Sequence, residues 1–254
     1  MIDFTDTSVT YPGGLVALKD VTLSIEKGEF VVIVGLSGAG KSTMLRAVNG
    51  LVPVSGSVVV DGREVVGASR SELRAIRADV GMIFQTFNLV NRSLVINNAL
   101  MGRLSQVPRW RSFLGLWPSQ DKEIALQSLE RVDIVEKAYV RASDLSGGQQ
   151  QRVGIARALA QEPNIILADE PVASLDPVTS HLVMRDLQRI NEELGITTLI
   201  NLHFLDLARQ YGKRLIGLND GRVVFDGDIA DVNDDVFRGI YGRAITPDDL
   251  VDKT

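Results

Sequence analysis

The sequence contains no cysteine and only two histidines among its 254 residues. Its core therefore needs no disulfide bonds, and this composition fits a reducing compartment. No apolar run approaches the roughly 18–20 residues that span a bilayer, and the N-terminus lacks the basic and apolar regions of a secretory signal. We therefore expect the protein to serve any membrane process from the surface, through partners.

The charge is also modest, with a formal net charge of −5 and no dense block of lysine or arginine. This argues against nucleic acid as the main ligand. With 254 residues and a hydrophobic fraction of 45%, the chain is expected to form one soluble globular unit. It contains neither a low-complexity linker nor an internal repeat of roughly 20–50 residues.

The clearest motif is a glycine-rich segment that follows a short apolar run. The run Phe30–Val34 is predicted to be a buried parallel strand, and residues 35–43 fit the P-loop pattern G-x-x-x-x-G-K-[ST]. A helix is expected from about Lys41, where free N–H groups and the helix dipole favour a phosphate. Lys41 would offer a cation to the β- and γ-phosphates, and Ser42 an oxygen to Mg²⁺. The alternative, an ordinary glycine turn, is disfavoured because strand, spacing, Lys-Ser pair and helix occur together.

A second glycine-rich turn, Leu-Ser-Gly-Gly-Gln at 145–149, precedes another predicted helix. A chain with both turns resembles the ATP-binding subunit of an ABC transporter, with residues 35–42 as the Walker A motif and 145–149 as the signature motif. The resemblance covers nearly the whole chain. It implies an ATP hydrolase in which the signature of one subunit closes over the Walker A nucleotide of the other, so that a homodimer holds two ATP molecules.

Two adjacent carboxylates, Asp169 and Glu170, follow the apolar run 165–168, which is predicted to be a strand. In parallel α/β sheets, ligands bind at the carboxyl ends of the strands. Asp169 can hold Mg²⁺, and Glu170 can polarise the water that attacks the γ-phosphate. On its own the segment would favour a solvated strand end before a proline turn. Beside the P-loop and the signature motif it favours the catalytic interpretation.

The resemblance assigns further roles. His203 corresponds to the switch histidine, Gln85 to the Q-loop glutamine that senses Mg²⁺ and water, and Asp176 to the D-loop. Tyr11 corresponds to the aromatic residue that stacks on adenine, although a tyrosine here would equally cap the β layer. Catalysis is thereby assigned to Glu170, His203 and Gln85, and Mg²⁺ binding to Ser42, Gln85 and Asp169. The residues expected to bind ATP are Tyr11, Gly35, Ser37, Gly38, Ala39, Gly40, Lys41, Ser42, Thr43, Ser146, Gly147, Gly148, Gln149 and Asp176.

Strands that alternate with helices predict an α/β fold with a mostly parallel sheet and helices on both faces. Short strands at 2–4, 16–18, 21–25 and 56–62 predict an added antiparallel β layer, and helices are expected near 69–78, 94–104, 119–131, 147–160 and 178–194. Together with the motifs, this predicts the P-loop NTPase fold of ABC ATPases. We expect a single nucleotide-binding domain over 1–254, with 1–87 and 161–254 as the core and β layer and 88–160 as a helical subdomain.

Several stretches look like the ATPase subunits of phosphonate importers, namely 84–92, 108–118, 167–177 and 201–203. This similarity implies a peripheral protein at the cytoplasmic face of the inner (cell) membrane. Its partners would be transmembrane permease subunits and, indirectly, a periplasmic substrate-binding protein, which together choose the solute.

Two questions stay open at this point. A related alternative function is the ABC-like ATPase component of carbon–phosphorus bond cleavage machinery. The segment 108–118, which holds both tryptophans, either packs within the helical subdomain or helps to receive the permease.

Overall fold

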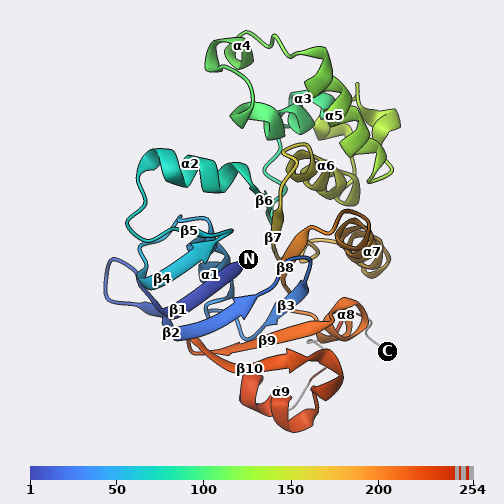
Figure 1. The fold of residues 1–254 in the computed structure, drawn as a ribbon. Helices are drawn as coiled ribbons and strands as arrows, with labels where there is room; N and C mark the ends of the chain where they lie inside the picture. Colours follow the sequence, from blue (N-terminus) through green and yellow to red (C-terminus); the bar gives the residue numbers. More distant parts are fainter. Residues whose placement is uncertain (244–245, 247–249, 252–254) are drawn as a thin grey trace.

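A six-stranded sheet forms the centre of the computed structural model, which describes residues 1–243, 246, 250 and 251 (Figure 1). The strand order is β10-β9-β3-β8-β7-β6. Five strands pair in parallel: β3 (Phe30–Val34), β6 (Val80–Ile83), β7 (Ile165–Asp169), β8 (Thr197–Asn201) and β9 (Arg214–Asn219). At one edge, β10 (Arg222–Asp228) pairs antiparallel with β9. The mostly parallel sheet predicted from the sequence is confirmed.

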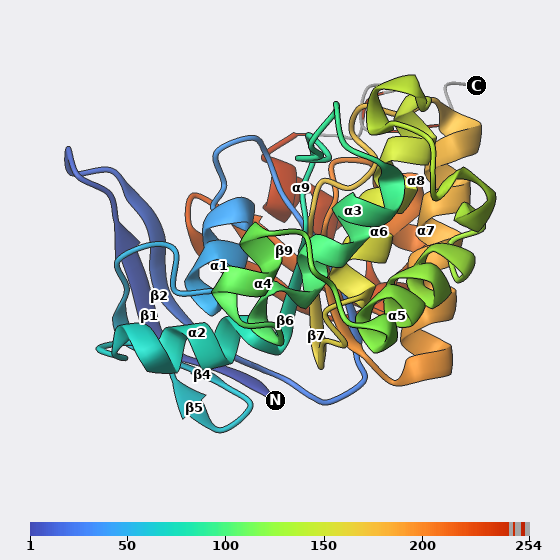
Figure 2. The same ribbon diagram turned by 90° about the horizontal axis from the view of Figure 1, so that it is seen from above.

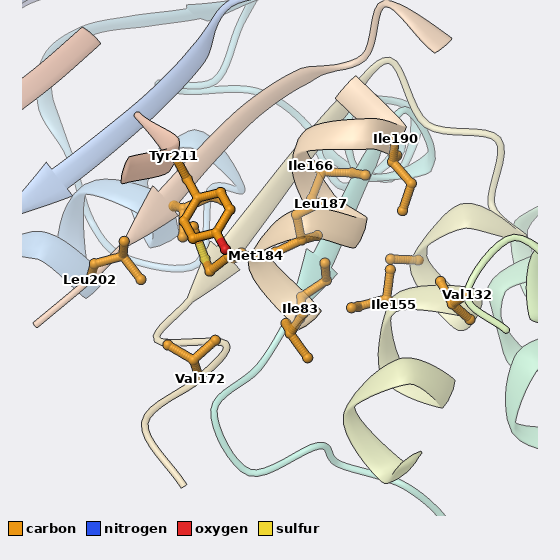
Figure 3. Close-up of a cluster of buried hydrophobic side chains, with 14 of the residues drawn as sticks. Ile83, Val132, Ile155, Ile166, Val172, Met184, Leu187, Ile190, Leu202 and Tyr211 are labelled. Atoms are coloured by element: carbon orange, nitrogen blue, oxygen red, sulfur yellow. The ribbon is translucent and has the colours of Figure 1, made fainter. Parts of the chain in front are cut away.

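The parallel strands are covered on both faces, which explains their continuous apolar runs. In β3, Phe30, Val32 and Val34 belong to one buried cluster, whereas Val31 and Ile33 belong to the other. Figure 3 shows part of the first cluster, where Ile83 and Ile166 from the sheet meet side chains of the surrounding helices. The alternation follows from the two-residue period of a strand.

A second, antiparallel sheet has the strand order β2-β1-β4-β5. Its strands are β1 (Ile2–Thr10), β2 (Val16–Ile25), β4 (Ser55–Val60) and β5 (Arg63–Glu64). The antiparallel layer is confirmed, but β1 and β2 are longer than the short strands predicted. The reason is that the ladder continues through irregularities near Asp6 and Asp20, whose positive φ angles of 46° and 51° let the chain absorb a bulge.

Helices cover both faces of the central sheet. On one side α1 (Lys41–Val48) lies between the two sheets, with Met44, Leu45 and Val48 in their shared core. Among the other helices outside the 88–160 region, α2 (Arg70–Ala78) and α7 (Pro177–Leu194) were foreseen, whereas α8 (Leu205–Tyr211) and α9 (Asp234–Tyr241) were not. At seven and eight residues, these two are too short for a clear helical periodicity.

The region 88–160 is helical, as expected, and its helices α3, α5 and α6 pack together (Figure 2). Its elements are α3 (Val95–Leu100), η1 (Met101–Ser105), α4 (Arg109–Phe113), α5 (Ser119–Glu130), η2 (Val135–Lys137), η3 (Ala142–Asp144) and α6 (Gly147–Leu159). A further short turn, η4 (Ile229–Asp231), follows β10. In the segment 108–118, Trp117 packs against the core, but Trp110 and Phe113 are 58% and 90% exposed. None of the helices in the described part of the chain has the length and apolar character needed to cross a membrane.

Candidate nucleotide-binding site

The glycine-rich loop between β3 and α1 fits tightly against neighbouring backbone. A Cβ atom on Gly35 would lie 2.3 Å from the carbonyl oxygen of Leu218, and one on Gly40 would lie 2.5 Å from that of Ala17. Gly40 also has a φ of +107°, in the region that favours glycine, and no side chain caps α1 at this residue. The first N–H groups of α1 therefore lack an intrahelical or side-chain partner and suit an anion.

Lys41 folds back over this loop. Lys41 is only 4% exposed, and its Nζ donates to the carbonyl oxygens of Gly35 at 2.7 Å and Leu36 at 3.2 Å. Burial lowers the pKa of Lys41, while the nearby carboxylates of Glu170 and Asp169 act in the opposite direction. The structure thus places one cation at the centre of the loop, with its donors held by backbone carbonyls.

Asp169, the last residue of β7, accepts two hydrogen bonds at one carboxylate oxygen. Ser42 Oγ donates to Oδ1 at 2.7 Å, and Asn201 Nδ2 donates to the same atom at 2.8 Å. Ser42 and Asp169 were both predicted as Mg²⁺ ligands, and the structure brings them together. Asn201 was missed as a site residue. It pairs directly with Asp169 in the β7–β8 ladder, and its buried Oδ1 has no hydrogen-bond partner among the described residues.

This donor set fits Mg²⁺, which prefers oxygen ligands and usually combines one or two protein oxygens with substrate phosphates and water. The described residues contain no group of three or more His, Cys, Asp or Glu that could hold a metal by themselves. Any Mg²⁺ here would therefore share its coordination between Ser42, Asp169 and a bound nucleotide.

Glu170 and His203 form a hydrogen-bonded pair, with 2.6 Å between Glu170 Oε1 and His203 Nε2, and the pair is an ion pair when His203 is protonated. The hydrogen bond from His203 lowers the pKa of Glu170, and the positive charges of His203 and Lys41 add to this effect against the opposing influence of burial. Glu170 also has a φ of +52°, an uncommon conformation for a residue other than glycine. The pair therefore keeps a carboxylate ionised at neutral pH and fixed at the end of β7.

Gln85 lies at the same edge of the sheet but outside this hydrogen-bonded group. Ile83 pairs with Ala168 in the β6–β7 ladder, so Gln85 and Glu170 each lie two residues beyond a paired position. The side chain of Gln85 is exposed and makes no hydrogen bond within the described residues. The structure thus brings Gln85 to the predicted edge without joining it to Asp169 or Glu170.

A cavity of about 420 Å³ lies over the loop and the start of α1. The hydroxyl of Tyr11 is 3.2 Å from Thr43 Oγ1, which holds the tyrosine ring at the wall of this cavity. Sequence reasoning did not single out Leu15, Ala17 and Arg46, which also line it. The lining residues are Tyr11, Leu15, Ala17, Ser37, Gly38, Gly40, Lys41, Ser42, Thr43, Arg46 and Glu170.

The signature segment lies apart from this cavity, at the start of α6, and none of its residues lines it. Ser146 and Gln149 form a capping box: Gln149 N donates to Ser146 Oγ at 3.4 Å, and Ser146 N donates to Gln149 Oε1 at 3.0 Å. Asp176 in turn caps α7, accepting hydrogen bonds from the backbone N and the Oγ1 of Thr179. The bond from Thr179 Oγ1 is the main cause of the lowered pKa of Asp176. Within one chain, the two glycine-rich turns therefore belong to separate surfaces.

The sequence was compared with known families and proteins. The model of the family described as ABC transporter matches residues 18–173. "Phosphonates import ATP-binding protein PhnC 1" of Halalkalibacterium halodurans is 57% identical over 254 residues, covering 100% of this chain and 99% of the relative. "Phosphonates import ATP-binding protein PhnC" of Staphylococcus epidermidis is 58% identical over 249 residues, covering 98% and 97%. The predicted resemblance is confirmed.

Solved structures agree with the predicted fold. A dimeric structure of MJ0796, a bacterial ABC transporter cassette, has a TM-score of 0.79 at 37% identity and covers 90% of this chain and 99% of its own. The ADP conformation of MJ1267, another ATP-binding cassette, has a TM-score of 0.81 at 27% identity and covers 94% and 97%. The family model matches more than half of the chain, and the relatives are more than half identical to it along nearly its whole length. The chain therefore belongs to the ABC transporter family, as one of its ATP-binding cassettes.

Proposed function

We propose that this protein is the ATP-hydrolysing subunit of a phosphonate importer. The observation that carries the catalytic part is the Glu170–His203 pair, an ionised carboxylate at the end of β7 beside the cavity over Lys41. The solute is inferred from the relatives, which are named phosphonate import proteins and match this chain over nearly its whole length. Phosphonates and related phosphorus oxyanions are therefore the substrate class.

Each residue of the site has a role in this proposal. Lys41 and the N–H groups of the 35–43 loop hold the phosphates, while the ring of Tyr11 lies against adenine. Glu170 orients the attacking water, and His203 holds Glu170 and approaches the γ-phosphate. Gln85 reaches from the neighbouring strand end toward the same water. Mg²⁺, held by Ser42 and Asp169 with Gln85 near it, would neutralise phosphate charge when bound.

The separation of the two glycine-rich turns supports a two-chain mechanism. Ser146, Gly147, Gly148 and Gln149 would contact the ATP held by the Walker A loop of a second copy, with Asp176 near the same interface. The neighbour MJ0796 has been solved as a dimer, once in a post-hydrolysis state bound to ADP and Pi. Closing the homodimer around two ATP molecules and reopening it after hydrolysis would drive transport.

The remaining partners follow from the transport role. Residues 88–160 would act as a helical subdomain and residues 1–87 and 161–254 as the core of one nucleotide-binding domain. The exposed Trp110 and Phe113 support a role for the segment 108–118 in receiving the permease, since aromatic residues are favoured at interface anchors. The protein would lie on the cytoplasmic face of the cell membrane, with a periplasmic binding protein delivering the solute to the permease.

The catalytic role is tested by Glu170→Gln in the purified protein. The amide keeps the size of the side chain but removes the carboxylate, so MgATP binding should persist while turnover falls by about a hundredfold or more. Glu136→Gln, a change at an exposed carboxylate that lies outside the lining of the cavity, serves as the control. Hydrolysis by Glu170→Gln at the wild-type rate would overturn the role assigned to Glu170.

The transport role is tested by uptake of a radiolabelled 2-aminoalkylphosphonate into vesicles that contain this protein with any permease and binding protein encoded beside its gene. Phosphonate uptake that requires ATP and an intact Glu170 supports the proposal. Uptake of another solute in its place would leave the ATPase role intact and refute the substrate. If no permease gene accompanies this gene and the protein co-purifies with enzymes that cleave carbon–phosphorus bonds, the alternative function replaces transport.

A further inference from the structure

Helix α6 holds the strand β6 at both ends. At the start of the strand, Gln161 Nε2, just beyond α6, donates to the carbonyl oxygens of Arg77 at 2.6 Å, Ala78 at 2.8 Å and Val80 at 3.1 Å. At the other end, Arg157 donates through one guanidinium nitrogen to Phe87 O at 2.9 Å and through the other to Asn88 O at 2.6 Å. The helix that begins at the signature motif is thereby tied to the strand that leads to Gln85.

The turn that Arg157 holds has an unusual backbone. Phe87 and Asn88 have φ angles of +51° and +50°, so two successive residues other than glycine adopt the left-handed conformation. Such residues are uncommon and persist where the surrounding structure enforces them. Asn88 N also bonds to Thr86 O, and Thr86 Oγ1 bonds to Asn88 Oδ1 at 3.1 Å, which closes a tight turn directly after Gln85.

The surroundings of Arg157 suit this task. Its side chain is partly buried, burial lowers its pKa, and it forms no ion pair among the described residues. The carbonyl oxygens of Phe87 and Asn88 therefore stabilise the charge of Arg157 by accepting charge-assisted hydrogen bonds, which are stronger than hydrogen bonds between neutral groups. Gly154, one turn earlier on α6, has no side chain and lies beside the same turn: a Cβ there would be 3.8 Å from Phe87 O. The planar fork of an arginine spans both oxygens, whereas a lysine ammonium is a single point charge.

We propose that Arg157 is a positioning residue for ATP hydrolysis. Its guanidinium fixes the left-handed turn at Phe87 and Asn88, and the turn fixes where Gln85 lies relative to Glu170. Because Arg157 belongs to the signature helix, the same contact couples the position of Gln85 to that of Ser146 in the same chain. This inference rests on the role proposed for Gln85.

The test compares four variants of the full-length protein: Arg157→Lys, Asn88→Gly, their combination, and the control Arg185→Lys, an exposed arginine on α7. Loss of the fork should let the turn relax and shift Gln85, which lowers kcat about tenfold or more, since misplacements of about 1 Å can cost a hundredfold. KM for MgATP and the affinity for ATP should stay within about twofold, because Arg157 is not among the described residues that line the cavity over the 35–43 loop. Glycine adopts the left-handed conformation without strain, so Asn88→Gly should restore much of the lost kcat in the double variant.

A fifth variant, Asn88→Val, disrupts the left-handed turn by a change in the turn itself and leaves Arg157 in place. It keeps the test decisive if Arg157→Lys folds poorly. Valine is strongly disfavoured at positive φ, so kcat should fall as in Arg157→Lys at an unchanged thermal midpoint within a few degrees. The inference is overturned if kcat of Arg157→Lys and Asn88→Val matches that of Arg185→Lys, or if Asn88→Gly restores nothing.

The variant Gln85→Ala distinguishes failure of the role proposed for Gln85 from failure of the positioning role of Arg157. If Gln85→Ala lowers kcat and the Arg157 and Asn88 variants do not, the positioning role of Arg157 fails and the role of Gln85 stands. A wild-type kcat for Gln85→Ala refutes the role of Gln85, and the inference about Arg157 falls with it.

Discussion

The contact between Gly148 and Thr179 gives a sharp prediction about how the signature helix is attached to the rest of the chain. A Cβ on Gly148 would lie 2.3 Å from Thr179 Cγ2, closer than any real Cβ contact. Thr179 is poorly able to turn away, because its hydroxyl donates to Asp176 at 2.6 Å and its backbone N donates to the same carboxylate at 3.0 Å. Gly148→Ala must therefore either shift α6 against α7 or break part of the cap of α7.

The cost of these two responses determines how much Gly148→Ala lowers the free energy of unfolding. Overpacking typically costs about 1–3 kcal/mol, and loss of a helix cap about 1 kcal/mol. Alanine in place of glycine in a helix returns about 0.5–1 kcal/mol. After subtraction of this gain, the free energy of unfolding of Gly148→Ala should fall by up to about 2 kcal/mol. Gly147→Ala is the matched control: its Cβ would meet Leu175 Cδ2 at an ordinary 3.6 Å, so this variant should keep the gain of about 0.5–1 kcal/mol without a steric cost.

Thr179→Ser supplies the rescue, because serine keeps the hydroxyl that binds Asp176 and lacks the methyl group that meets the new Cβ. Urea denaturation followed by circular dichroism, without nucleotide, measures the wild type, the three single variants and the double variant. We expect the double variant Gly148→Ala/Thr179→Ser to regain at least half of the loss, a coupling that contacting residues show and distant ones do not. Equal stability of Gly148→Ala and Gly147→Ala, or additive losses in the double variant, would refute this account of the contact.

Three further predictions concern the site itself. Lys41→Ala should weaken ATP binding at least tenfold by calorimetry, because Lys41 is the cation centred on the loop; unchanged affinity would contradict its role. In a Glu170→Gln background, Ser146→Arg should abolish the ATP-dependent dimers that sedimentation detects. Ser146→Ala loses the same helix cap without added bulk and should retain these dimers. Dimers in both variants would refute the two-chain model. The pKa of Glu170 is lowered in the folded protein, so the stability it contributes is complete above its ordinary value of 4.5 and is lost as the pH falls through the folded value. The stability difference between wild type and Glu170→Gln should therefore shrink as the pH falls below about 4.5; a difference that grows on acidification below that pH would show the opposite linkage.

Much of the site was predictable because its residues lie at or just beyond strand ends. Asp169 and Glu170 come at the end of β7, and Lys41 begins the helix that follows β3; parallel strands bring such ends to one edge of the sheet. Asn201 was missed although it ends a strand in the same way, since an amide carries no charge or motif of its own. Its importance depends on β8 lying beside β7, which is known only once the strand order is known.

The contacts of α6 were beyond sequence reasoning for a related reason. The left-handed turn at Phe87 and Asn88 uses residues that give no local signal for positive φ, as a glycine would. Its partner Arg157 lies 70 residues away from Phe87 along the chain. In the sequence, Arg157 is one more charged residue on a helix whose apolar face is Val153, Ala156 and Ala160. Only the packing of α6 against β6 shows what it holds.

These contacts also restrict how the signature motif can move. Near its N-terminus α6 packs through Gly148 against Thr179, at the start of α7, and further along it bonds through Arg157 to the turn after Gln85. Beyond its C-terminus Gln161 holds the start of β6. A displacement of Ser146 that left the rest of the chain in place would have to break the first or the second of these attachments. The signature helix is therefore expected to move together with the turn at 87–88 and the cap of α7, so that a second subunit closing on Ser146 would act at the same time on Gln85 and Asp176.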